Sequence, residues 1–170
     1  KAIIYTRNSN NLTVERIERA IGQAYEAGVL GHNILDSGIN IDISIRKGPG
    51  AYVCGEETAL IRSIEGKRGM PTVKPPYPTE QGLFGKPTVV NNVETIANIS
   101  NIILNGVNWF TSIGTEHSTG TKIFSVSGKV NRTSAIELPM GAPLSKIIEV
   151  VGGVANDGKL KAIHIGGPSG

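Results

Sequence analysis

One stretch of the sequence decides its fold: Gly48-Pro49-Gly50-Ala51-Tyr52-Val53-Cys54-Gly55-Glu56-Glu57-Thr58. It follows residues 41–46, where isoleucine occupies every second position, and it leads into helical spacing over residues 56–65. Strand, glycine-rich loop and helix in this order indicate an α/β layer. Such a loop leaves N–H groups free at a helix N-terminus, where they attract phosphate or another anion. Glu56 and Glu57 can instead simply cap that helix, and spacing alone slightly favours the cap over a functional role.

The strand and helix pattern continues on both sides of this stretch. Residues 2–6 predict a buried strand, and residues 14–25 have apolar side chains at helical spacing, with Thr13 as the expected N-cap. Residues 70–87 hold five prolines, which predicts an irregular ordered loop or a linker. A further helix is expected over residues 93–104.

The pattern changes beyond Gly114. Four elements are expected there: strands over 121–130 and 135–138, a helix over 143–151 and a last strand over 160–165. Two strands, a helix and a returning strand indicate a small β-grasp unit. We therefore predict two domains, residues 1–114 and residues 115–170, with the boundary near 114–120.

Composition excludes several classes of protein. The net charge is only +3 and aromatic residues make up 5% of the chain, so a nucleic-acid partner is not expected. Cys54 is the one cysteine, which rules out an internal disulfide and a cysteine-rich metal or iron–sulfur site in this chain. The three histidines have no ligand spacing, so no metal site is predicted. No apolar stretch reaches the ~20 residues of a membrane span.

Two more segments and one side chain have alternative interpretations. Asn91-Asn92 can cap a helix or read the edge of a planar heterocycle, and the cap is favoured. Lys74 and Tyr77 lie in the proline-rich loop, which is either a stiff connector or a platform for stacking and charge pairing with a nucleotide. Cys54 has no histidine near it in the sequence, so a buried structural cysteine is favoured over a nucleophile.

Several motifs occur in a fixed order along the chain. They are Gly48–Leu60, Ser63-Ile64-Glu65-Gly66-Lys67, Lys74-Pro75-Pro76-Tyr77-Pro78, Gly82-Leu83-Phe84-Gly85-Lys86-Pro87, Asn91-Asn92-Val93-Glu94-Thr95 and Trp109-Phe110. Together they resemble the flavin- and NADH-binding subunit of complex I-type NADH dehydrogenases. They also resemble the diaphorase subunits of NAD-linked and electron-bifurcating hydrogenases and of NAD-dependent formate dehydrogenases. The resemblance covers essentially the whole chain.

The resemblance implies a fold and an activity. The fold is α/β, with part of a three-layer-like FMN-binding domain followed by all or part of a ubiquitin-like, soluble-ligand-binding β-grasp domain. In the family, hydride passes from NADH or NADPH to FMN, and single electrons pass to a [4Fe-4S] cluster, which would lie outside this chain. The implied partners are a thioredoxin-like [2Fe-2S] subunit and other subunits of an electron-transfer complex. The implied location is the cytoplasm, on the peripheral arm if the complex is respiratory, without direct membrane insertion.

The resemblance also assigns roles to individual residues. FMN would contact Tyr52, Gly55, Glu56, Glu57, Val90, Asn91, Asn92 and Thr95. Lys74 and Tyr77 fall on the NADH side, where an aromatic ring stacks on adenine. Glu57 also lies near the nicotinamide and is the residue we assign to catalysis. The hydride chemistry belongs to the cofactor, so these side chains supply orientation and electrostatics.

The sequence also departs from the family pattern. Pro49 stands where alanine is common, Arg7–Leu12 is looser than usual, and the upstream glycine-rich loop that wraps the FMN phosphate is not in the chain. We therefore expect the 170 residues alone to bind FMN weakly or not at all and to be inactive. The alternative is a non-enzymatic ligand-binding or docking module built on the β-grasp unit. Such a module has no need of both the glycine-rich loop and Asn91–Thr95.

Overall fold

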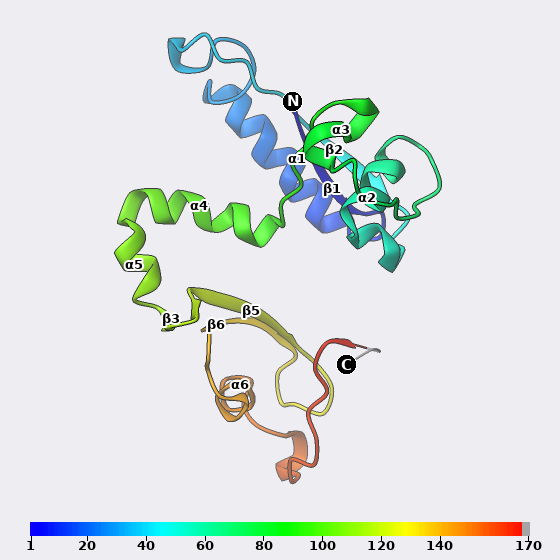
Figure 1. Ribbon diagram of the computed structural model, residues 1–170. Helices are drawn as coiled ribbons and strands as arrows, with labels where there is room; N and C mark the ends of the chain where they lie inside the picture. Colours follow the sequence, from blue (N-terminus) through cyan, green and yellow to red (C-terminus); the bar gives the residue numbers. More distant parts are fainter. Residues whose placement is uncertain (168–170) are drawn as a thin grey trace. The chain divides into compact units, whose positions relative to one another are not determined.

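The first part of the chain is a strand–helix–strand unit. The computed structural model describes residues 1–167 and divides the chain into two compact units, Lys1–Val90 and Asn91–Gly170 (Figure 1). Strand β1 (Ala2–Arg7) pairs in parallel with β2 (Ile43–Gly48), in register from Ala2 opposite Ile43 to Arg7 opposite Gly48. Parallel neighbours need a crossover, which is supplied here by helix α1 (Asn11–Glu26) and a loop containing a 3₁₀ turn (Ile34–Asp36).

Helix α1 begins earlier than the apolar pattern predicts. Its N-cap is Asn10, so Thr13 lies inside the first turn and the expected Thr13 cap is wrong. The apolar periodicity starts at Val14, the one buried residue of the helix, because residues 11–13 before it are exposed, Leu12 included. The helix ends at Glu26, and Gly28 just beyond it has a left-handed φ of 69°, which glycine adopts readily.

The first unit is held together where β1, β2 and α2 (Glu57–Ile64) meet. The Tyr5 hydroxyl on β1 hydrogen-bonds the Ser63 hydroxyl on α2 at 2.9 Å. Its ring lies over Gly48 so closely that a β-carbon there would stand 1.9 Å from the phenol oxygen. Cys54 is buried beside Gly69, where a β-carbon would come within 2.7 Å of its sulfur. The interpretation of Cys54 as a buried structural cysteine is confirmed.

The proline-rich loop contains short regular pieces. Helix α3 (Pro78–Gln81) places proline in its first turn, where the missing N–H costs nothing, and the Glu80 carboxylate accepts the Tyr77 N–H at 3.1 Å. A 3₁₀ turn (Leu83–Gly85) follows. The peptide bonds Lys74–Pro75 and Pro75–Pro76 are cis. Of the two predicted alternatives, an ordered loop and a linker, the structure shows the ordered loop, and it contains one helical turn that the sequence analysis did not predict.

The second unit begins with two helices joined at a glycine. Helix α4 (Val93–Asn105) confirms the helix expected over 93–104, and α5 (Val107–Thr111) follows it after Gly106, whose φ is 85°. A two-residue hairpin of β3 (Gly114–Thr115) and β4 (Ser118–Thr119) then leads into the last part of the chain. The predicted domain boundary at 114–115 stays a prediction.

The β-grasp part contains an antiparallel ribbon and a helix. Strands β5 (Thr121–Val126) and β6 (Ser134–Pro139) pair from Thr121 opposite Pro139 to Val126 opposite Ser134. Helix α6 (Leu144–Val150) buries Ile147, and Val151 directly after it is fully buried. The strand predicted over 160–165 is wrong, because these residues carry no strand pairing in the structure. Their apolar side chains line a hollow against β5 and α6 instead.

Candidate functional site

Glu56 fixes the start of α2. The preceding 3₁₀ turn (Tyr52–Gly55) brings the chain to Glu56 in an extended conformation, and its carboxylate then accepts the N–H groups of Thr58 at 2.8 Å and Ala59 at 3.0 Å. The Thr58 hydroxyl donates to the same oxygen. Two of the otherwise unsatisfied amides of the helix end are thereby paired, and the interpretation of Glu56 as a cap is confirmed.

Lys74 joins the two glutamates across the loop. Its ammonium makes an ion pair with Glu57 and lies 3.3 Å from Glu56 Oε1, the carboxylate oxygen that does not cap the helix. All three side chains are about one-third exposed, so the cluster faces solvent without being fully hydrated. The family resemblance placed Glu57 beside the flavin and Lys74 on the NADH side, and the structure brings these two residues together.

The cluster shifts the pKa values of its members. The Glu57 carboxylate raises the pKa of the Lys74 ammonium. Partial burial works in the opposite direction, and the Glu56 carboxylate adds to the rise, so the pKa of Lys74 lies above its ordinary value. Burial works to raise the pKa of Glu56. Hydrogen bonds from Thr58, the Ala59 N–H and Lys74 outweigh burial, so the pKa of Glu56 lies below its ordinary value. Lys74 and Glu56 are therefore both charged at neutral pH.

The surroundings of this cluster leave room for a flat ring. The Tyr52 side chain is 92% exposed, and a β-carbon built at Gly55 meets nothing within 4 Å. Tyr77, at the N-cap of α3, is 53% exposed. Exposed aromatic rings on the glycine-rich and proline-rich loops, open backbone at Gly55 and hydrogen-bonding carboxylates are features that suit a planar heterocycle, and in this respect the residues fit FMN and a nicotinamide nucleotide.

Three residues that support this loop were not singled out from the sequence. The buried Thr58 hydroxyl accepts the Thr72 N–H at 2.9 Å and so ties the loop after α2 back to the helix start. The Glu65 carboxylate accepts the Phe84 N–H at 2.7 Å and pairs with Lys67 at 2.8 Å. The Thr88 hydroxyl accepts the Leu83 N–H at 2.9 Å. Only tertiary pairing reveals these contacts, because no local pattern distinguishes them.

The second predicted stretch lies at the junction of the two units. Val90 ends the first unit and is half-buried, whereas Asn91, Asn92 and Thr95 belong to the second unit and are exposed. Asn92 is the N-cap of α4, and its side-chain oxygen accepts the Glu94 N–H at 2.8 Å, which confirms the capping interpretation. Asn92 and Thr95 border a hollow of about 350 Å³ between α4 and the start of β5.

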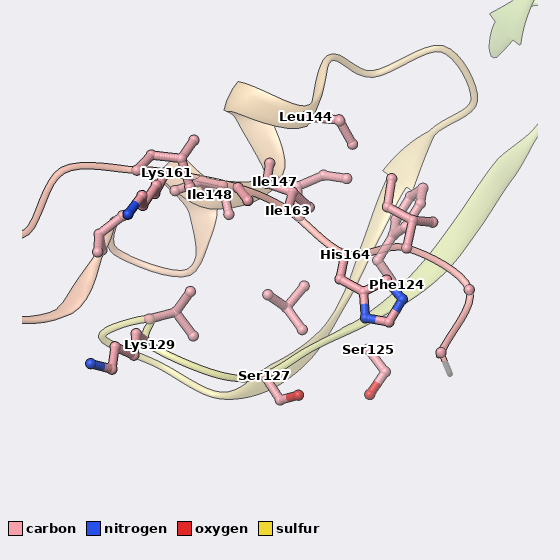
Figure 2. A pocket seen from close by; sticks show the side chains of 18 of the residues that line it. Phe124, Ser125, Ser127, Lys129, Leu144, Ile147, Ile148, Lys161, Ile163 and His164 are labelled. Carbon is pink, nitrogen blue, oxygen red and sulfur yellow. The ribbon is translucent and has the colours of Figure 1, made fainter. Parts of the chain in front are cut away.

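A larger hollow of about 1060 Å³ lies entirely in the β-grasp part (Figure 2). Figure 2 shows Ile147, Ile148 and Ile163 on one side of it, facing the strand that carries Phe124. Four lysines also line it: Lys122, Lys129, Lys159 and Lys161. None of the residues predicted to contact FMN or NADH borders this hollow.

The described part of the chain offers neither a metal site nor a membrane-spanning helix. Within residues 1–167, no group of three or more histidine, cysteine, aspartate or glutamate residues could hold a metal ion. Among the same residues no helix is both long enough and apolar enough to cross a membrane.

Two family models match this sequence. The Nuo51 FMN-binding domain covers residues 1–101, and the SLBB domain covers residues 123–169. The first match includes the glycine-rich loop, the Lys74 loop and Asn91–Thr95. The second includes most of β5 and all of β6 and α6.

Individual relatives agree with these matches. The chain is 52% identical over its whole length to HndC of Solidesulfovibrio fructosivorans, which is a subunit of an NADP-reducing hydrogenase and of which the chain spans 35%. It is 49% identical to a subunit of the NADH-quinone oxidoreductase of Rickettsia bellii, with 98% of the chain and 40% of the relative aligned. A crystal structure of an NAD⁺-reducing [NiFe]-hydrogenase in the H₂-reduced state aligns with 88% of the chain and 25% of the matched protein, at 40% identity and a TM-score of 0.77. The chain therefore spans well under half the length of these relatives.

Proposed function

We propose, on the premise that this chain belongs to the family of Nuo51 FMN-binding domains, that it forms part of an FMN-dependent NADH or NADPH dehydrogenase. The observation that carries the proposal is the cluster of Glu56, Glu57 and Lys74 beside Tyr52 and the open backbone of Gly55. It lies within the family match and combines the polar and aromatic groups that a flavin site needs.

FMN would be held by two stretches of this chain. In the first, Gly55 lets the ring system approach the backbone, and Tyr52 offers an exposed aromatic side chain. Glu56 is held rigid by the helix cap, so its remaining oxygen keeps a fixed position. The second stretch is Val90, Asn91, Asn92 and Thr95. Its amides and hydroxyl supply both donors and acceptors for the edge of the ring.

NADH or NADPH would bind on the side of Lys74 and Tyr77. The Tyr77 ring is exposed, and the backbone of Tyr77 is held at the N-cap of α3, where the Glu80 carboxylate accepts its N–H at 3.1 Å. Lys74 carries the positive charge that an anionic dinucleotide requires, but the two glutamates already share that charge. Binding of a phosphate by Lys74 would therefore compete with Glu57.

When bound, FMN supplies the redox chemistry, accepting hydride from the nicotinamide and releasing electrons singly. The protein's contribution is to hold the two rings together and to set the local charge. We assign the second of these contributions, setting the local charge near the nicotinamide, to Glu57. Its negative charge, partly offset by Lys74, opposes the extra negative charge of a reduced flavin and so tunes the flavin potential.

The later electron carriers would lie outside this chain. With Cys54 as its one cysteine, buried in the first unit, the chain has no set of thiolates for a [4Fe-4S] cluster. We propose that the cluster belongs to another part of the full-length protein. We also propose that a thioredoxin-like [2Fe-2S] subunit and other subunits are partners, and that the assembly works in the cytoplasm, on a peripheral arm if it is respiratory.

Two matched glycine substitutions in the full-length protein test this assignment. Gly55 and Gly22 both lack a left-handed φ, and a β-carbon at either meets nothing within 4 Å, so alanine fits both positions in the fold. If FMN lies against Gly55, Gly55→Ala weakens FMN binding about tenfold or more, whereas Gly22→Ala leaves it unchanged. Equal FMN dissociation constants for the two variants and the parent would contradict the proposal that FMN lies against this loop.

The same pair of variants addresses the alternative of a docking module. A module built on the SLBB region would use the apolar hollow of Figure 2, which Gly55 does not border. Under that alternative neither substitution affects ligand binding.

A further inference from the structure

Glu94 has no role in the proposed site, although it lies between two residues that do. It occupies the first turn of α4, after the cap Asn92 and before Thr95. A carboxylate at this position ordinarily interacts with the N–H groups of its own helix end. Here its side chain points to β5 instead, where it accepts the Ile123 N–H at 3.1 Å and makes an ion pair with Lys122.

Glu94 is held from three directions. Its N–H donates to the Asn92 side-chain oxygen at 2.8 Å, and its carbonyl accepts the Asn98 side-chain amide at the same distance. Its carboxylate is fixed by β5, from residues 28 and 29 positions farther along the chain. The Lys122 ammonium, followed by the Ile123 N–H, holds the pKa of Glu94 below its ordinary value, so the carboxylate is charged at neutral pH.

The pair borders the hollow that Asn92 and Thr95 also border. That hollow, of about 350 Å³, has Glu94 and Lys122 in its wall together with two of the proposed flavin contacts, Asn92 and Thr95. All of these residues belong to the second unit, so the arrangement does not depend on how the two units are placed. The first turn of α4 therefore carries two things: the side chains proposed to contact the flavin, and the glutamate that bonds to β5.

We infer that Glu94 is a positioning residue that fastens the first turn of α4 to β5 at Lys122 and Ile123, where the SLBB match (residues 123–169) begins. Strand β5 thereby holds the proposed flavin contacts Asn92 and Thr95 in place. The inference rests on the proposed function, because it takes these two residues as flavin contacts. Through the bonds from Glu94 to Lys122 and Ile123, β5 would support the flavin site. This support would not depend on whether a ligand binds in the larger hollow of Figure 2.

The pair also has an electrostatic consequence that a purely structural link lacks. Lys122 neutralises the Glu94 carboxylate, whose charge would otherwise stand uncompensated beside the flavin. Lys122→Met keeps that negative charge and so makes the flavin midpoint potential more negative. Glu94→Gln removes the charge and leaves the lysine unpaired, which does not shift the potential in that direction. Both variants loosen the link.

The experiment uses the full-length protein with Glu94→Gln, Lys122→Met and the control Lys146→Met. Lys146 is a suitable control because it is as exposed as Lys122 and also pairs with a glutamate, Glu149, but within α6. Flavin is removed, FMN is titrated back by fluorescence, and the midpoint potential and thermal unfolding are recorded. We expect the FMN dissociation constant to rise about threefold to tenfold in the two test variants and to stay within about twofold in the control.

Each outcome decides the inference. Weaker FMN binding in both test variants, with a more negative potential only in Lys122→Met, supports it. Unchanged FMN binding and potential overturn it even if thermal stability falls, because the pair then serves stability alone. A parent protein that binds no FMN overturns the proposed function and this inference together. A parent that binds FMN normally beside unaffected variants overturns this inference only.

Discussion

Replacing Gly48 by alanine tests the packing that positions the glycine-rich loop. Gly48 is the buried last residue of β2, and a β-carbon there would lie 1.9 Å from the Tyr5 phenol oxygen and 2.1 Å from the adjacent ring carbon. The Tyr5 ring would have to withdraw by about 1.5 Å to regain ordinary contact. Because β1 and β2 are paired at this level, the ring cannot withdraw without leaving Ser63.

The cost follows from these contacts. Overpacking of this kind costs about 1–3 kcal/mol, and loss of the half-buried hydrogen bond between Tyr5 and Ser63 adds about 1 kcal/mol. We expect Gly48→Ala to lower the free energy of unfolding by about 2–4 kcal/mol. Urea unfolding followed by circular dichroism measures this change. Gly22→Ala, in an open part of α1, is the control and should stabilise the protein by up to about 1 kcal/mol.

A second background separates crowding from other effects. Tyr5→Leu removes the phenol oxygen and the ring atoms that Gly48→Ala would meet. In that background Gly48→Ala should cost less than about 1 kcal/mol, so the two substitutions are strongly non-additive. An equal cost in both backgrounds would refute the argument, since the Tyr5 ring would then not be the obstacle.

Three further outcomes are expected. The lowered pKa of Glu56 means that its contribution to stability is full above its ordinary value of 4.5 and is lost as the pH falls through the lowered value. Unfolding free energies measured from pH 6 to about 3 should therefore fall less steeply in Glu56→Gln than in the parent, and parallel curves would contradict this. In the full-length protein Glu57→Gln removes a negative charge and breaks the ion pair with Lys74. Redox titration should therefore give a more positive flavin midpoint potential. An unchanged potential argues against a role for Glu57 in tuning the flavin. The isolated 170-residue chain should bind FMN weakly or not at all, and a yellow preparation with one FMN per chain would disprove that.

Local sequence signals predicted the elements around the site well. The alternation over residues 41–46 and the helical spacing after Gly55 predicted β2 and α2, and the capping interpretations of Glu56 and Asn92 agree with their hydrogen bonds. These features depend on contacts within a few residues, which residue type and spacing largely determine.

Apart from the N-cap of α1, which lies at Asn10 and not at Thr13, the failures concern contacts between distant segments. The ion pair of Lys74 with Glu57 spans 17 residues across a loop shaped by prolines, and no periodicity specifies it. The apolar alternation over residues 160–165 predicted a strand, but alternation does not determine whether a partner edge is available. On β5 the Ile123 N–H already bonds to Glu94, and the expected strand lines an apolar hollow without pairing. The bonding of Glu94 to β5 could not be predicted for the same reason, since its partners lie 28 and 29 residues away in the sequence.

The most direct test of the proposed function is reduction of bound flavin by NADH or NADPH in the full-length protein. The purified protein, after incubation with FMN and removal of the excess, is mixed anaerobically with each nucleotide while the flavin absorbance is followed. We predict one tightly bound FMN per protein and bleaching of its absorbance by at least one of the two nucleotides. A protein that retains no FMN, or whose bound FMN neither nucleotide bleaches, would contradict the proposal.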